Sequence, residues 1–372
     1  MNPYRDTVTW LTFQSHLPDA PSSFWLLLGE VREALRQLKG SPLAAPDARR
    51  LERELAVQGI HARLALDGLG LPLDQVRKHL TDRSAQAANH GELDAFLSEL
   101  NQVAPGPNTL TPDDIKRVHR SLHLEAREDE RPGEWRLHPF GGRPWEGLPP
   151  ELIGLFVEEL FDWLKSAELA APTPSTEEAY ALIRLMFMEL YLAWIRPFTS
   201  GHARTAGILG AKVLGGGDMA VPTVHLLAIA MHRNGREYQR QVQKAAEGKA
   251  DPVPFMTFLL RALMDAIGEC QERMRDLQLR GQWRAQLLEL FQEGNDAPTR
   301  RQRQVLLDLA SVNEPVPQNR LDSLTPALAQ LYAGVSDKTL RRDVDALVSA
   351  GVVKKEGGAL RLDLGNTLLF NG

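Results

Sequence analysis

Apolar residues recur three and four positions apart along most of this chain, with polar residues between them. This spacing is typical of amphipathic helices. The N-terminal helices predicted in this way cover residues 23–38, 47–66 and 74–80. Prolines and glycines, which break helices, interrupt the pattern at residues 41–47 and again at residues 102–114. We therefore predict an N-terminal helical module over residues 1–100.

The middle of the chain continues the helical pattern, with one exception at residues 133–151. This stretch, GEWRLHPFGGRPWEGLPPE, is rich in glycine, proline and tryptophan, so we expect a short β-hairpin flap rather than a helix. A polar break at residues 293–301 precedes a segment of different composition. The expected fold class is mainly α, with an all-helical core over residues 101–290 and an α+β domain over residues 297–372.

Composition and charge narrow the possible functions. The formal net charge of −5 over 372 residues excludes a chain that is basic throughout, but it leaves room for one small basic domain. A single cysteine, Cys270, cannot form an internal disulfide, which fits a reducing compartment. The first residues do not resemble a signal peptide, and charges interrupt every apolar run well short of a membrane span. We expect a cytoplasmic protein without a membrane partner.

Residues 336–363 carry a pattern of their own, SDKTLRRDVDALVSAGVVKKEGGALRLD. Ser336 is a good N-cap, and the helix that follows ends at a glycine before two short strands around Glu-Gly-Gly. One stripe of this helix is apolar, comprising Leu340, Val344, Leu347 and Val348. The opposite face is polar and basic early in the helix, comprising Lys338, Thr339, Arg341 and Arg342. Two more cations, Lys354 and Lys355, precede the Gly-Gly turn.

This segment resembles the winged helix-turn-helix domains of bacterial regulators. The motif T-x-x-R-D-x-x-x-L-x-x-x-G is carried by Thr339, Arg342, Asp343, Leu347 and Gly351. In such domains the second helix meets base edges with its N-terminal residues, and the wing contacts phosphates. From Thr299 onward there are ten Lys and Arg against eight Asp and Glu, so the net charge is +2, a modest electrostatic footprint. We expect duplex DNA as a partner and a homodimer that binds paired half-sites; a winged helix used only for packing or dimerisation is the alternative.

A second motif lies at residues 195–207, IRPFTSGHARTAG, between two apolar helical runs. A helix, a tight loop and a new helix N-terminus form an anion site, because free N–H groups and the helix dipole point the same way. The loop resembles the Fic-family motif H-x-F-x-[D/E]-G-N-G-R-x-x-R. Flanking segments extend this resemblance, at residues 115–122, 130–136, 140–164 and 232–259.

Fic proteins transfer AMP, or another phosphate-containing group, from a nucleotide to a protein hydroxyl. The resemblance implies that the loop's histidine deprotonates the hydroxyl, its acidic residue holds Mg²⁺, and its amides and arginines hold phosphates. Phe198, Gly201 and Arg204 match the motif. Arg196 stands at the position of the histidine and Ser200 at that of the acidic residue. The remaining departures are His202, Ala203 and Gly207, which stand at the Asn, second Gly and final Arg positions.

These departures remove two chemical roles together. A guanidinium does not accept a proton near neutral pH, and a serine is a poor ligand for a hard cation. We therefore predict a Fic-fold pseudoenzyme that acts as a DNA-binding transcriptional regulator, without a metal. Its cleft would bind the phosphate of ATP or another nucleotide, or serve dimerisation, through Arg196, Ser200, Gly201, His202, Ala203 and Arg204. A cleft without a ligand, in which Arg196 pairs with Glu189, is an equal alternative.

The alternative function is an active nucleotidyl (AMP) transferase with Mg²⁺, in which His202 or His138 replaces the base. Residues 63–68 also resemble the inhibitory Fic motif [S/T]-x-x-x-E-[G/N], whose glutamate pairs with the final arginine of the loop. Arg63, Asp67 and Gly68 occupy its named positions. Because Gly207 stands where that arginine would be, we expect this brake to have lost its partner. Gly68 is equally well explained as a helix C-cap.

Overall fold

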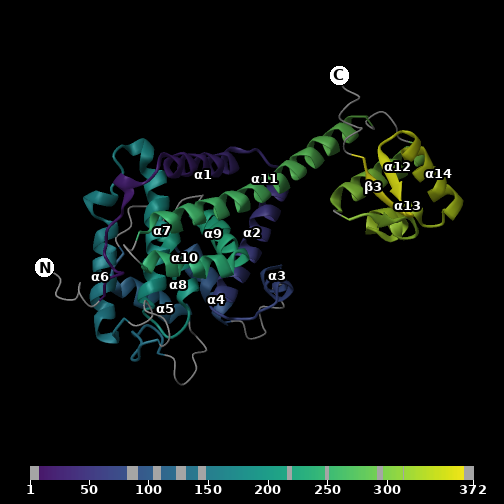
Figure 1. The fold of residues 1–372 in the computed structure, drawn as a ribbon. Helices are drawn as coiled ribbons and strands as arrows, with labels where there is room; N and C mark the ends of the chain where they lie inside the picture. Colours follow the sequence, from purple (N-terminus) through teal and green to yellow (C-terminus); the bar gives the residue numbers. More distant parts are fainter. Residues whose placement is uncertain are drawn as a thin grey trace. The chain divides into compact units, whose positions relative to one another are not determined.

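The chain is described by a computed structural model for residues 8–81, 91–103, 110–122, 131–140, 148–215, 220–247, 251–290, 296–312 and 314–363. It is mostly helical, which confirms the predicted fold class (Figure 1). The chain divides into two compact units. Unit 1 comprises Met1–Ser41 and Ala48–Gln271, and unit 2 comprises Pro42–Asp47 and Glu272–Gly372. Among the described residues, no helix is both long and apolar enough to cross a bilayer.

Four helices precede the predicted boundary near residue 100. They are α1 (Ser22–Gly40), α2 (Ala45–Leu66), α3 (Leu73–Thr81) and α4 (Gly91–Asn101). α1 buries the stripe of Phe24, Leu28 and Val31 that its spacing predicts. The apolar core that contains these side chains continues without a break to Cys270, so the predicted boundary lies inside unit 1.

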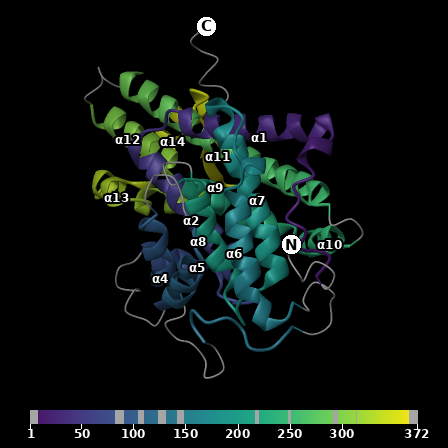
Figure 2. The same ribbon diagram turned by 90° about the vertical axis from the view of Figure 1, so that its left-hand side faces the viewer.

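The rest of unit 1 is built around one buried helix. The helices are α5 (Pro112–Leu122), α6 (Ile153–Leu164), α7 (Glu177–Ile195), α8 (His202–Val213), α9 (Ala220–Arg233), α10 (Gly235–Ala246) and the first part of α11 (Val253–Leu290). From Ala181 onward α7 is apolar on nearly all sides, as expected of a helix surrounded by others. α6 and α8 pack along α7 (Figure 2). The loop between α7 and α8 therefore lies at the end of two helices that are packed together.

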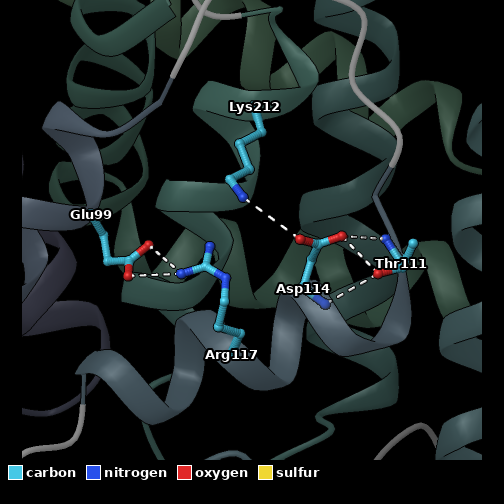
Figure 3. Close-up of polar contacts among 5 residues, drawn as sticks. All are labelled: Glu99, Thr111, Asp114, Arg117 and Lys212. Atoms are coloured by element: carbon cyan, nitrogen blue, oxygen red, sulfur yellow. Dashed lines mark hydrogen bonds and ion pairs between the residues drawn. The ribbon is translucent and has the colours of Figure 1, made fainter.

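A polar network joins α4, α5 and α8 (Figure 3). Arg117 Nη1 donates to both carboxylate oxygens of Glu99, at 3.0 and 3.2 Å. Asp114 caps α5 together with Thr111: the Thr111 amide donates to Asp114 Oδ2 (2.9 Å), and the Asp114 amide donates to Thr111 Oγ1 (3.3 Å). Lys212 Nζ of α8 lies 3.9 Å from Asp114 Oδ1. The start of α5 is therefore held toward α8.

The predicted flap over residues 133–151 is described in part. Residues 131–140 form turns and bends without a paired strand, and a short 3-10 helix, η4 (Pro150–Leu152), leads into α6. Residues 141–147, the tip of the predicted hairpin, lie outside the described residues. Three further 3-10 helices, η1 (Leu17–Asp19), η5 (Ala167–Leu169) and η6 (Pro174–Thr176), connect elements of unit 1.

Unit 2 combines helices with a small antiparallel sheet. Its elements after α11 are α12 (Ala297–Ser311), β1 (Val316–Pro317), η7 (Gln318–Ser323), α13 (Pro326–Tyr332), α14 (Asp337–Ser349), β2 (Val353–Glu356) and β3 (Ala359–Leu362). The strand order is β1-β3-β2, with Val353 opposite Leu362. Gly357 and Gly358 turn between β2 and β3 with φ of 59° and 82°, as a type I′ hairpin requires. A separate core surrounds Leu306, Val344 and Leu360.

Candidate functional site

The loop between α7 and α8 reverses the chain sharply. Arg196 ends α7 in the left-handed region, at φ 44° and ψ 68°, and Gly201 precedes α8 at φ 71°. A positive φ is common for glycine but strained for arginine, so the surrounding contacts must hold Arg196 in place.

Arg136 supplies several of these contacts. Its Nε donates to the carbonyl of Arg196 (2.8 Å), and its backbone N–H donates to the carbonyl of Pro197 (2.9 Å). Its terminal nitrogens donate to the carbonyls of His138 and Leu148, each at 2.8 Å. Burial lowers the pKa of this guanidinium, and the positive charge of Arg196 lowers it further. Arg136 thus fixes the start of the loop by donating to the main-chain carbonyls of Arg196 and Pro197, and it is itself anchored by the carbonyls of His138 and Leu148.

His119 of α5 holds the other end of the loop. The Gly133 amide donates to its Nδ1 (2.9 Å), so Nε2 carries the hydrogen and donates to the carbonyl of Ser200 (3.1 Å). The imidazole also stacks on Phe198, with ring centroids 3.7 Å apart. Sequence reasoning did not assign a role to His119; its position beside the loop depends on the packing of α5 against α8.

Asp67, at the end of α2, occupies the anion site at the N-terminus of α8. Its Oδ1 accepts the Ala203 amide (2.7 Å), while its Oδ2 accepts the Arg204 amide (3.1 Å) and Arg204 Nε (2.9 Å). Both side chains of this ion pair are 3% exposed. The expectation that Asp67 lacks a partner is therefore wrong. The absence of an arginine at position 207 does not leave Asp67 unpaired, because Asp67 binds Arg204, the first arginine of the motif, and two N–H groups at the start of α8.

Arg63, one turn earlier on α2, makes a second buried contact with the loop. Its Nη2 donates to Glu189 Oε1 (2.7 Å) and its Nη1 to the carbonyl of Ala203 (3.2 Å). Arg63 lies against Gly207, where a Cβ would come 3.1 Å from Arg63 Nε. Glu189, considered above as a partner for Arg196, instead pairs with Arg63.

A cleft of about 230 Å³ remains between the loop, α2 and α10. Of the predicted ligand-binding residues, it is lined by Arg196, Ser200, Gly201, His202 and Ala203, whereas Arg204 is engaged with Asp67. The volume is below the roughly 300–1,000 Å³ of ordinary small-molecule sites. Asp67 itself forms part of the wall, so the carboxylate that fills the anion site also narrows the cleft.

The histidines considered as substitute bases occupy different surroundings. His202 lines the cleft, with its ring centroid 6.2 Å from that of Phe140 and 6.4 Å from that of Phe198. His138 is exposed. The guanidinium of Arg196 lies over the Phe140 ring, 4.0 Å from its centroid. The residue that aligns with the histidine of the motif this loop resembles is thus a cation held against an aromatic face.

Metal binding finds little support at this site. Among the described residues, two carboxylates line the cleft, and these, Asp67 and Glu189, are paired with Arg204 and Arg63. Mg²⁺ prefers carboxylate oxygens together with water, so this donor set does not fit it. Within the described ranges, no group of three or more His, Cys, Asp or Glu side chains is placed to hold a metal.

In unit 2, α14 carries the predicted DNA-binding residues. Ser336 is its N-cap residue, as predicted, but its hydroxyl makes no capping hydrogen bond to a backbone amide and lies 3.2 Å from the hydroxyl of Thr339 instead. Lys338, Arg341 and Arg342 are exposed, whereas Thr339 is half-buried. Lys355 is also exposed, but Lys354 forms an ion pair with the buried Asp363, at 2.9 Å. All six predicted DNA-binding residues therefore lie in unit 2, but the charge of Lys354 is paired with that of Asp363.

A buried network fixes the rotation of α14 about its axis. Asp343 Oδ2 accepts Arg301 Nε of α12 (2.6 Å) and the hydroxyl of Tyr332 of α13 (3.0 Å). Burial raises the pKa of the Tyr332 hydroxyl, and the charge of Asp343 raises it further, so Tyr332 remains a donor. Asp343 therefore acts inside the unit, and the face opposite to it is left to solvent.

We compared the sequence and the fold with those of known proteins. Neither protein-family models nor curated protein sequences give a match. Among solved structures, Fic-1 (residues 134–508) from C. elegans is similar with a TM-score of 0.52 and 20% identity, over 68% of this chain and 73% of that chain. A Fic domain containing signaling protein from Bacteroides thetaiotaomicron has a TM-score of 0.48 and 18% identity, over 67% and 97%. The likeness to Fic-1 extends to the fold, and over about two thirds of its length this chain therefore has a Fic fold.

Proposed function

We propose that this protein is a DNA-binding regulator whose Fic-fold unit no longer catalyses group transfer. The observation that carries the proposal is the exposed basic start of α14. Lys338, Arg341 and Arg342 project from its first half, and none of them forms an ion pair within the described residues. Such cations at the start of a helix suit contact with base edges and phosphates in a major groove.

The surroundings of α14 support a winged-helix assignment for unit 2. Three helices and three strands follow one another as α12, β1, α13, α14, β2 and β3, and the last two strands form a tight hairpin. α13 and α14 are joined by a short turn that contains Gly334, with φ 75°. This order suits a helix-turn-helix followed by a wing. A homodimer would present two copies of α14 to paired half-sites.

The loop of unit 1 supports the loss of transferase chemistry. Arg196 stands where the family's base is expected, and its guanidinium stays protonated at neutral pH. Loss of a general base alone costs roughly 10²–10⁴-fold in rate. What the loop retains is two helix N–H groups and Arg204, which bind a carboxylate here and can bind a phosphate oxygen instead. We propose that phosphate or a nucleotide competes with Asp67 for this site.

Binding of the full-length chain to a labelled duplex of random sequence tests the regulatory function. We expect affinity that falls steeply with salt concentration, because phosphate contacts release counterions. The variant K338A/R341A/R342A should bind more weakly and show a salt slope smaller by about 1–2. Circular dichroism and thermal unfolding serve as the folding control. Failure of the folded wild-type chain to bind at low salt, or equal binding by the variant, would overturn the proposal.

Incubation with labelled ATP and Mg²⁺ tests the competing function. His202 lines the cleft and is the residue through which residual transfer would run. We expect no covalent label on the chain or on lysate proteins. Reproducible labelling that is lost in both Arg204→Ala and His202→Ala would instead establish a transferase with a non-standard base.

A further inference from the structure

α14 presents two neighbouring rows of side chains to solvent, because residues four apart lie one above the other on a helix. One row contains Asp337, Arg341 and Asp345. The other contains Lys338, Arg342 and Ala346. All six residues are exposed, and the buried contacts of Asp343 with α12 and α13 prevent the helix from rotating to exchange one row for the other.

The two rows differ in charge. Arg341 has a carboxylate one turn before it and another one turn after it, so its row carries a net negative charge at the spacing where helix charges interact. Arg342 instead follows a second cation, Lys338, and precedes the small Ala346. Its row is positive and ends in a residue that permits close approach. Asp345 also lies three residues beyond Arg342, a spacing at which helix charges interact as well, so Arg342 has one carboxylate residue within a turn and Arg341 has two.

Most of the positive charges on the hairpin after α14 are paired with carboxylates. Lys354 is paired with Asp363 (2.9 Å), and Arg361 is paired with Glu356 (3.0 Å). Lys355 is exposed and makes no ion pair in the described part of the chain. Lys355 lies opposite Leu360 in the register, on the other face of the hairpin from the Lys354–Asp363 pair, and its side chain is exposed.

We propose that Arg342 is the base-reading residue of this protein, on the Lys338–Arg342 row, and that Lys355 contacts a phosphate. The inference rests on the proposed DNA-binding function and adds which side chains determine its specificity. A guanidinium binds the O6 and N7 acceptors of guanine bidentately, so we expect a G·C pair to be specified at one position of each half-site. Arg341 has a carboxylate residue one turn away on either side, in a row of net negative charge, and contributes little to that choice.

Selection from a randomised duplex library with the full-length chain, followed by binding measurements on the selected duplex, tests this assignment. Arg342→Ala should weaken binding roughly 5- to 150-fold and relax the preference at one G·C position. The matched control Arg341→Ala should weaken binding less than about 3-fold and keep the preference. Lys355→Ala should weaken binding to all duplexes alike and reduce the salt slope by about 1.

Each outcome decides the question. A greater loss of specificity in Arg341→Ala than in Arg342→Ala overturns the row assignment while leaving the DNA-binding function intact. An unaltered base preference in Arg342→Ala does the same. Binding without any selected sequence overturns base reading but not DNA contact, and the absence of binding by the folded wild-type chain refutes the proposed function itself.

Discussion

Replacing Asp67 with alanine removes the carboxylate that α2 inserts at the start of α8. The side chain is 3% exposed and accepts three hydrogen bonds, from the amides of Ala203 and Arg204 and from Arg204 Nε. Removing one partner of a buried ion pair costs about 3–5 kcal/mol. Each kcal/mol lowers the melting temperature of a large domain by about 2–4 °C, so we expect a decrease of roughly 6–20 °C.

Thermal unfolding of the full-length chain, followed by circular dichroism, measures this decrease. Asp74→Ala is the matched control, because Asp74 pairs with Arg77 but its side chain is 92% exposed, and loss of such a surface pair costs about 1 kcal/mol or less. Inorganic phosphate should restore part of the lost stability in Asp67→Ala, since the freed amides then bind the anion, and should do little for the wild type. Equal melting of the two variants, or equal stabilisation of wild type and Asp67→Ala by phosphate, would refute the reasoning.

Three further predictions concern packing, pH and unit 2. Gly59→Ala should lower the free energy of unfolding, measured by chemical denaturation, by roughly 1–3 kcal/mol, because its Cβ would lie 2.3 Å from His225 Nδ1. The control Gly29→Ala should not lower it, because no atom lies within 4 Å of the added Cβ. Burial, with the charge of Arg63, lowers the pKa of His225 from 6.5 to about 4. The unfolded chain then binds more protons between these values, so stability should fall by about 3 kcal/mol as the pH falls through them, and His225→Gln should abolish this dependence in denaturation curves. Asp343→Ala should destabilise unit 2 by about 3–5 kcal/mol in urea, whereas the exposed Asp345→Ala should change it by less than about 1 kcal/mol.

The local elements of this fold could be predicted because their signals are local. The helices expected over residues 23–38 and 47–66 correspond to α1 and α2, with ends that differ by at most two residues. The hairpin after α14 follows from its paired glycines, which tolerate the positive φ of the turn. The same holds for the α7–α8 loop, where Gly201 allows the chain to enter α8.

The partners of the site residues could not be predicted in this way. Asp67 and Arg204 are 137 residues apart, and Arg63 and Glu189 are 126 apart, so only the packing of α2 against α7 and α8 brings each pair together. A motif alignment assigned Asp67 a partner at position 207 and therefore predicted that the contact was lost. One signal was present: Arg63 is a charged residue inside the apolar run ARLAL, which indicates a buried cation with a partner elsewhere.

The contact between Arg63 and Gly207 restricts how this protein can change by mutation. A side chain at position 207 would begin only 3.1 Å from Arg63 Nε, so a larger residue fits there only if the Arg63 side chain shifts. Shortening residue 63 first would strand the carboxylate of Glu189 in the interior without its counter-charge. Positions 63 and 207 are therefore coupled, and the residue at either one limits which side chains the other can accept.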